Sequence, residues 1–281
     1  MPIITAADST SLFVCDWGDP AAPPVVFVHA WGLNGDMWGA QVPALIDAGF
    51  RPVTYDQRGF GRSGRPRSGY DLDTLADDLA AVVNVLDLRD IILVGHSLGA
   101  QVAVRYLTRQ PSHKVAGLVL SAPIPPMPRR SDDNPDGVDE AVFEAHRQAM
   151  ARDIGAFVDA TPPAEYFGPA KAISPALADW TRRQIVDTPP HVLMETQKAF
   201  SRADLRAELP GIGRPTIILH GSADRSAPLE KAGRPIAALV PGSRLVVFDG
   251  AGHGLYTSEA PGYNAEIIRF AETLVTAQSA A

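Results

Sequence analysis

A serine lies between two glycines in Gly95-His96-Ser97-Leu98-Gly99, directly after an apolar run and directly before a helix-forming segment. The apolar run covers residues 91–94, and the helix-forming segment covers residues 100–109. A serine on a sharp turn from a strand into a helix is exposed for nucleophilic attack and held in a sparsely populated backbone conformation. Glycines on either side leave room for the neighbouring strand and helix. The spacing therefore predicts that Ser97 is a nucleophile on such a turn.

Such a serine needs a base and an acid, and candidates for both occur later in the chain. Residues 216–219 are predicted to form a buried strand, which the turn Gly221-Ser222-Ala223-Asp224 follows. Residues 244–248 are predicted to form another strand, which leads into the glycine-rich segment Asp249-Gly250-Ala251-Gly252-His253-Gly254. Because the carboxyl ends of parallel strands meet at one edge of a sheet, we expect Ser97, Asp224 and His253 to converge there. Asp249 is a competing acid, but it precedes His253 closely and is predicted to shape the turn.

These residue types in this order predict acyl-transfer chemistry. A serine hydroxyl becomes a strong nucleophile when a neutral imidazole accepts its proton, which is the role of His253, while Asp224 would fix the tautomer and stabilise the imidazolium. The backbone N–H of Leu98 would bind the oxyanion together with a second N–H, which we assign to Trp31 in the loop after residues 25–28. Loss of one such donor typically costs about 3 kcal/mol of transition-state stabilisation.

The remaining pattern predicts strands that alternate with helices. The expected strands cover residues 12–17, 25–28, 51–55, 91–94, 115–121, 216–219 and 244–248. The middle strands are continuously apolar, which indicates that helices cover both faces of a parallel sheet. Residues 72–86 carry apolar side chains at helical spacing, with Asp71 or Asp73 as the cap.

The alternation stops after residue 122. Pro123, Pro125, Pro126 and Pro128 prevent regular structure, and residues 138–206 follow a helical pattern without convincing strands. We therefore predict a core made of residues 1–122 and 213–281, with residues 123–212 inserted as a helical cap over the carboxyl ends of the strands. The predicted lining of a largely apolar substrate pocket is Met127, Phe143, Phe157, Tyr166, Phe167, Trp180 and Phe200.

The sequence resembles the α/β-hydrolase superfamily over nearly the whole chain. Besides the turn at residues 95–99, the resemblance rests on His29-Ala30-Trp31-Gly32, Asp56-Gln57-Arg58-Gly59-Phe60-Gly61-Arg62-Ser63 and Gly250-Ala251-Gly252-His253. It implies an α/β class chain with the α/β-hydrolase fold, which is a mostly parallel, doubly wound sheet flanked by helices, with a helical cap inserted after the sixth strand.

Within that superfamily the chain is most similar to the cofactor-free haloperoxidase, aryl esterase and perhydrolase group. The similarity lies in Asp16-Trp17-Gly18 and in Ala76-Asp77-Asp78-Leu79. Two positions depart from the group: Ala30 stands in place of a glycine, and His96-Ser97-Leu98 replaces a Phe-Ser-Thr-like turn. Both departures favour ester hydrolysis over halogenation or peracid formation.

Composition points to a globular protein with a small-molecule partner. Of its 281 residues, 46% are hydrophobic and 20% are charged, and the net charge of −7 disfavours binding to nucleic acid or to an anionic membrane. No apolar run reaches the roughly 18 residues that a membrane span requires. A single cysteine, Cys15, and an N-terminus without a secretion signal predict a cytoplasmic location. The oligomeric state is left open.

Metal and cofactor sites are not predicted. The seven histidines include no pair at zinc-binding spacing, and the sequence has no Cys-x-x-Cys motif. Gly59-Phe60-Gly61-Arg62-Ser63-Gly64 has the wrong spacing for a dinucleotide loop. His29, His96 and His220 are predicted to be structural rather than catalytic.

Together these features predict a cofactor-independent serine hydrolase that cleaves an ester or lactone of a modest, largely apolar molecule through an acyl-serine intermediate. Two alternative reactions use the same three residues: hydrolysis of a carbon–carbon bond in a vinylogous diketone, and perhydrolysis or haloperoxidation, in which hydrogen peroxide intercepts the acyl-enzyme. Dehalogenation and epoxide opening are disfavoured, since they need an aspartate at position 97. A third alternative is a non-catalytic ligand receptor on the same fold.

Overall fold

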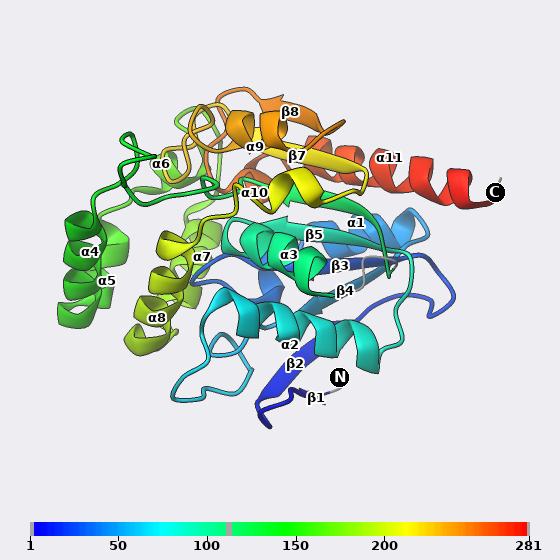
Figure 1. Ribbon diagram of the computed structural model, residues 1–281, viewed down its shortest axis with the longest axis horizontal. Helices are drawn as coiled ribbons and strands as arrows, with labels where there is room; N and C mark the ends of the chain where they lie inside the picture. Colours follow the sequence, from blue (N-terminus) through cyan, green and yellow to red (C-terminus); the bar gives the residue numbers. More distant parts are fainter. Residues whose placement is uncertain (1–2, 111–113, 280–281) are drawn as a thin grey trace.

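An eight-stranded sheet forms the centre of the computed structural model, which describes residues 3–110 and 114–279 (Figure 1). The strand order is β1-β2-β4-β3-β5-β6-β7-β8. The strands are β1 (Ile3–Thr5), β2 (Ser11–Asp16), β3 (Pro24–Val28), β4 (Arg51–Tyr55), β5 (Ile91–His96), β6 (Val115–Ser121), β7 (Thr216–Gly221) and β8 (Arg244–Phe248). Only the β1–β2 and β2–β4 pairs are antiparallel, so the predicted mostly parallel sheet is confirmed.

Helices cover both faces of this sheet. The helices of the core are α1 (Gln41–Asp47), α2 (Leu72–Val85), α3 (Leu98–Arg109), α9 (Gly233–Leu239), α10 (Leu255–Ser258) and α11 (Ala260–Ser279), with the short 3₁₀ turn η1 (Gly35–Trp38). A second 3₁₀ turn, η3 (Leu209–Gly211), precedes β7. Along β3, Val26 and Val28 belong to the apolar core that α2 and α3 complete, whereas Val25 and Phe27 belong to the core that α1 and α11 complete. This is why β3 is apolar at every position.

Two local expectations are refined by the structure. Of the two proposed caps for α2, Asp71 is the one used, because its carboxylate accepts a hydrogen bond from the backbone N–H of Thr74. The strand β1 was not among the expected strands. It has only three residues, of which Ile4 alone is buried, so it gives almost no alternating pattern to detect.

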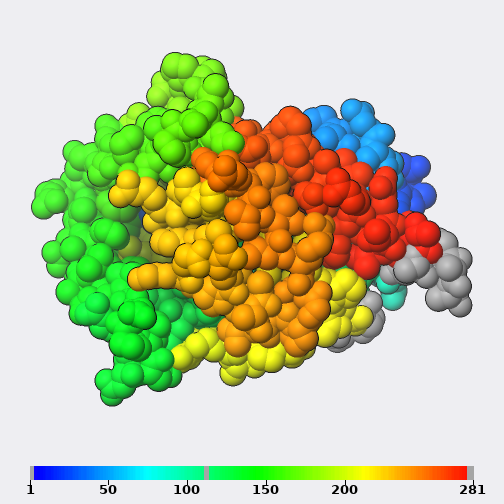
Figure 2. Space-filling model, turned by 90° about the horizontal axis from the view of Figure 1, so that it is seen from above, coloured from blue at the N-terminus to red at the C-terminus, as the bar shows by residue number. Residues whose placement is uncertain are grey.

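Five helices separate β6 from β7. They are α4 (Glu140–Arg152), α5 (Ile154–Asp159), α6 (Pro163–Phe167), α7 (Pro175–Val186) and α8 (Pro190–Arg202), and all fall inside the range predicted for the insertion. Most of them gather at one end of the sheet, opposite the C-terminus (Figure 1). In Figure 2 this green segment covers one end of the molecule and borders the yellow-to-orange surface of the residues after β7. In the described ranges, no helix combines the length and the apolar character that crossing a bilayer requires.

A buried arginine joins three segments of the fold. Arg58, whose side chain is 2% exposed, bonds both carboxylate oxygens of Asp78 on α2 at 2.6 Å. The same guanidinium donates to Asp8, which precedes β2, at 2.7 Å. The charge of Arg58 therefore holds three segments together: the turn at residues 56–64, α2 and the N-terminal strands.

Replacing this arginine is expected to destabilise the fold strongly. Arg58→Met leaves the buried Asp78 without a cation, and breaking a buried pair in this way costs about 3–5 kcal/mol. Urea unfolding followed by circular dichroism measures the change. Arg89→Met is the matched control, since the Arg89–Asp87 pair is exposed and exposed pairs contribute about 0–1 kcal/mol. Equal losses in the two variants would contradict the structural role of Arg58.

Candidate active site

Ser97 lies on a sharp turn between β5 and α3. Its backbone has φ 56° and ψ −115°, and residues other than glycine rarely adopt a positive φ. The Ser97 N–H donates to the carbonyl of Ser121 at 2.9 Å, which ties the turn to the end of β6. Strain of this kind is characteristic of functional positions, where the surrounding structure maintains it.

The two flanking glycines are required by close backbone contacts. A Cβ at Gly95 would lie 2.3 Å from the carbonyl oxygen of Gly99, and a Cβ at Gly99 would lie 2.2 Å from that of Val28. Both distances are far below van der Waals contact, so no larger residue fits. The second contact also brings the N-terminus of α3 against the loop after β3, in which Trp31 lies.

Asp224 and His253 form a buried pair. The Nδ1 atom of His253 lies 2.8 Å from Oδ2 of Asp224, and the residues are 7% and 4% exposed respectively. Burial alone would raise the pKa of Asp224, but the charge and hydrogen bond of His253 and the N–H of Ala227 outweigh it and lower the pKa below its usual value. Asp224 is therefore a carboxylate at neutral pH. The competing acid, Asp249, instead accepts a hydrogen bond from Ser222 at 3.0 Å, and it is exposed.

The imidazole of His253 lies next to the turn that carries Ser97. Its ring centroid is 5.0 Å from that of His96, the residue immediately before the serine. Within residues 3–110 and 114–279, no hydrogen bond joins Ser97 Oγ to His253. In free enzymes this contact is often long and shortens when substrate binds. All three predicted residues thus follow the carboxyl ends of neighbouring or nearby parallel strands, β5, β7 and β8.

Two backbone N–H groups near Ser97 are unused. In the described part of the chain, neither the N–H of Leu98, the first residue of α3, nor that of Trp31 donates a hydrogen bond. The Trp31 loop is held in place, because the Trp31 indole N–H donates to the carbonyl of Leu193 on α8 at 3.0 Å. Unpaired donors at a helix N-terminus can stabilise a developing oxyanion.

The other histidines near the site are held by hydrogen bonds, in line with a structural role. His29 Nε2 accepts from the Gln57 N–H at 2.8 Å, and burial lowers the pKa of His29 to about 4. His96 contacts the Ser121 hydroxyl at 2.8 Å, and burial followed by the nearby His253 lowers its pKa. His220 lies 2.7 Å from the carbonyl of Ala227, and burial lowers its pKa as well. We conclude that these three imidazoles are neutral and support the loops around the site.

A cavity of about 180 Å³ lies between α5, α6 and α7 and reaches Trp31. It is lined by Trp31, Phe157, Val158, Thr161, Pro163, Tyr166, Phe167, Ala178, Thr181, Arg182 and Ile185. Tyr166 connects this cavity to the base, since its ring packs edge-on against the ring of His253 at 5.8 Å. Three of the seven predicted pocket residues, Phe157, Tyr166 and Phe167, are therefore part of the lining.

The other four predicted pocket residues do not line this cavity. Phe143 is buried on α4, Met127 lies near Ser131 before α4, and Phe200 on α8 packs on Trp31 from outside the cavity. Trp180 does not line the cavity, because the face of α7 that lines it consists of Ala178, Thr181, Arg182 and Ile185. These positions follow the i, i+3, i+4, i+7 spacing of one helical face, and this spacing could have identified the lining face of α7 from the sequence. The prediction instead selected residues because they are aromatic.

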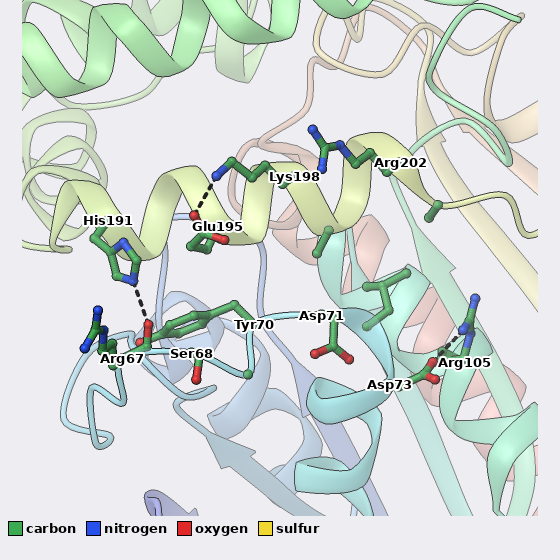
Figure 3. Close-up of a pocket in the computed structure, with 14 residues that line it drawn as sticks. Arg67, Ser68, Tyr70, Asp71, Asp73, Arg105, His191, Glu195, Lys198 and Arg202 are labelled. Atoms are coloured by element: carbon green, nitrogen blue, oxygen red, sulfur yellow. Dashed lines mark hydrogen bonds and ion pairs between the residues drawn. The ribbon is translucent and has the colours of Figure 1, made fainter.

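A larger, open groove lies elsewhere, between α8 and the segment before α2 (Figure 3). Ser97, Asp224 and His253 line neither the cavity at Trp31 nor this groove, which has a volume of about 730 Å³. The cavity differs from the groove in that its Tyr166 packs against His253. In the groove, Lys198 pairs with Glu195 at 2.7 Å and Arg105 pairs with Asp73. Size alone therefore does not identify the site of chemistry.

Among the described residues, no group of three or more histidine, cysteine, aspartate or glutamate side chains could hold a metal ion. His113, one of the seven histidines considered in the sequence, lies outside those residues.

Comparisons with known proteins agree with this fold. Residues 23–260 match the family model of the alpha/beta hydrolase fold. The chain is 35% identical over 276 residues to a non-heme haloperoxidase of Rhodococcus erythropolis, covering 97% of this chain and 100% of that protein. It is 34% identical to a bifunctional esterase/perhydrolase of Acinetobacter calcoaceticus, covering 96% and 99%. Among solved structures, an esterase from Exiguobacterium antarcticum superimposes with a TM-score of 0.90 at 30% identity, covering 96% of this chain and 98% of the esterase.

Proposed function

Because the chain belongs to the α/β-hydrolase family of enzymes, we propose that it is a cofactor-independent serine hydrolase that cleaves a carboxylic ester or lactone of a small, largely apolar molecule. The observation that carries the proposal is the buried His253–Asp224 pair, which lies beside the strained turn of Ser97. This arrangement supplies a nucleophile, a base and an orienting carboxylate in one place.

Acylation would start with attack of Ser97 Oγ on the carbonyl carbon while His253 Nε2 accepts the hydroxyl proton. Asp224 holds the proton of Nδ1, so that Nε2 is the free acceptor, and it stabilises the imidazolium. The N–H groups of Trp31 and Leu98 would bind the tetrahedral oxyanion. Collapse of this intermediate breaks the ester C–O bond, and His253 returns its proton to the departing alkoxide.

Deacylation would repeat these steps with water. His253 removes a proton from the water as it attacks the acyl carbon, and Ser97 leaves with that proton restored. The products are the acid and the free enzyme, so no redox partner is needed. The lining between α5 and α7 is mostly apolar, and its one charged residue, Arg182, is paired with Asp159, so it favours an acyl group without charge.

Turnover of p-nitrophenyl butyrate, combined with labelling by a fluorophosphonate probe, tests this function. We expect steady release of p-nitrophenol and a mass increase on the peptide that contains Ser97. A panel of short and long esters that gives no turnover, together with an unlabelled Ser97, would instead favour the non-catalytic receptor.

The names of two relatives favour perhydrolysis as a second candidate function, because one is a haloperoxidase and the other an esterase/perhydrolase. Hydrogen peroxide would replace water in deacylation and give a peracid from the same acyl-serine. Peracid formation from acetate and peroxide measures this activity. Its absence in an enzyme that hydrolyses esters would restrict the function to hydrolysis.

A cytoplasmic location stays a prediction from the sequence.

The size of the cavity predicts a preference for short acyl groups. Phe157 lines the cavity beside Trp31, with its ring centroid 6.4 Å from that of Trp31. We expect Phe157→Ala to raise kcat/KM for p-nitrophenyl octanoate relative to the acetate by about 10–100-fold, since each methylene that gains a pocket contributes about 1–3 kcal/mol. Trp180→Leu, which changes an aromatic residue of α7 outside the cavity, should leave the ratio unchanged. If Phe157→Ala leaves the octanoate-to-acetate ratio of kcat/KM unchanged, the acyl group does not bind in this cavity.

A further inference from the structure

The short helix α6 of the insertion packs directly on the loop that carries His253. The N–H of Gly252 donates to the carbonyl of Phe167 at 3.1 Å, and the N–H of Gly254 donates to that of Tyr166 at 2.7 Å. These glycines are the immediate neighbours of His253 on both sides. The last carbonyls of a helix lack partners within it, so the end of α6 offers the acceptors that the loop uses.

This contact is made between backbone atoms. A larger residue there cannot be accommodated by rotation of a neighbouring side chain. A Cβ at Gly252 would lie 2.5 Å from the Tyr166 carbonyl oxygen and 2.8 Å from the Gly168 nitrogen. In the other direction, a Cβ at Gly168, where φ is 114°, would lie 2.3 Å from the Gly250 carbonyl oxygen. Any larger residue at these positions must therefore push α6 and the loop apart.

Side chains fasten the same two segments. The Tyr166 ring packs edge-on against the His253 ring, with an interplanar angle of 69°. The Tyr166 hydroxyl lies 3.5 Å from that of the buried Tyr256, just after the loop. Lys171, which follows α6, pairs with Glu259 at 2.6 Å. The base is thus held by Asp224 from the core and by α6 from the insertion.

We propose that α6 is a positioning element for the base, with Tyr166 as its principal positioning side chain. This inference rests on the proposed function, in which His253 is the base. Tyr166 and Phe167 also line the substrate cavity, so one helix both forms the wall of the cavity and sets the orientation of the imidazole. Docking of the insertion then controls the rate of the chemical step as well as the choice of substrate.

Gly252→Ala tests the backbone contact without changing any cavity side chain. A displacement of about 1 Å at a reacting group costs on the order of 100-fold in rate, so we expect kcat for p-nitrophenyl butyrate to fall by about that factor while KM changes less than about threefold. Gly211→Ala is the matched control, because a Cβ there meets nothing within 4 Å. It should keep wild-type kcat and KM.

The pair Tyr166→Phe and Tyr166→Leu tests the ring, and it also decides the question if Gly252→Ala fails to fold. The phenylalanine keeps the edge-on contact, whereas the leucine removes it. We expect kcat to drop about tenfold or more in the leucine variant and to stay within about twofold of wild type in the phenylalanine variant. Fluorophosphonate labelling of Ser97 should slow in parallel with kcat.

The outcomes separate this inference from the proposed function. If the wild type hydrolyses the ester but Tyr166→Leu keeps wild-type kcat, and Gly252→Ala does so wherever it folds, α6 does not position the base. If only KM rises in these variants, α6 serves substrate binding alone and the inference is likewise overturned. A wild type without esterase activity and without Ser97 labelling would contradict the proposed function itself.

Discussion

Alanine at position 97 is expected to lower kcat for ester hydrolysis by about 10⁶-fold, the loss that removal of a serine nucleophile typically causes. The change deletes one oxygen and keeps the Cβ, so the strained φ of 56° is the same for both residues. The N–H of Ser97 still donates to Ser121, and the turn keeps its geometry. Release of p-nitrophenol over hours measures the residual rate, and circular dichroism checks the fold.

Ser68→Ala provides the matched control for this variant. Ser68 is exposed on the loop before α2, in the groove of Figure 3, and does not line the cavity beside Trp31. It should retain wild-type kcat and fluorophosphonate labelling. A Ser97→Ala enzyme that still turns over the ester at more than about a hundredth of the wild-type rate would end the acyl-serine mechanism.

The sequence predicted where the three candidate residues lie in the fold, because their signals are local. A Cβ at Gly95 or Gly99 would lie 2.2–2.3 Å from a backbone oxygen, and such a constraint leaves a fixed spacing around Ser97. Asp224 and His253 each follow an apolar strand closely, so their common position at the edge of the sheet follows from parallel strand topology. The mostly parallel sheet was predictable for the same reason, since burial on both faces makes each central strand continuously apolar.

The pocket was less predictable because it depends on how separate helices pack. The composition of α7 favours its one tryptophan, Trp180, as a pocket residue, but the turn of the helix presents Ala178 and Ile185 to the cavity instead. The contact between α6 and the His253 loop consists of backbone atoms from segments far apart in the chain. Gly252 and Gly254 are consistent with a close approach of backbone to the His253 loop. Nothing in their spacing identifies Tyr166 and Phe167 as the residues whose carbonyls they bind.

Asparagine at position 224 is expected to lower kcat by about 10⁴-fold through the wrong histidine tautomer. The Oδ1 atom of Asp224 accepts the Ala227 N–H at 2.9 Å, and Oδ2 faces His253 Nδ1 at 2.8 Å. An asparagine that keeps its oxygen toward Ala227 presents its NH₂ group to Nδ1, which must then accept a hydrogen bond. The imidazole proton moves to Nε2, and that atom can no longer take the proton of Ser97. The opposite amide orientation is disfavoured, because it places two donors against each other at Ala227.

Asp249→Asn is the control that separates the two candidate acids, and it should keep wild-type kcat because Asp249 bonds Ser222 rather than His253. The double variant Asp224→Asn/His253→Ala adds a second test. If the carboxylate acts only through the imidazole, the double variant is no slower than His253→Ala alone, since residues that act as a unit are not additive. A further loss in the double variant would mean that Asp224 contributes to catalysis independently of His253. A large loss in Asp249→Asn, with Asp224→Asn near wild type, would transfer the role of the acid to Asp249.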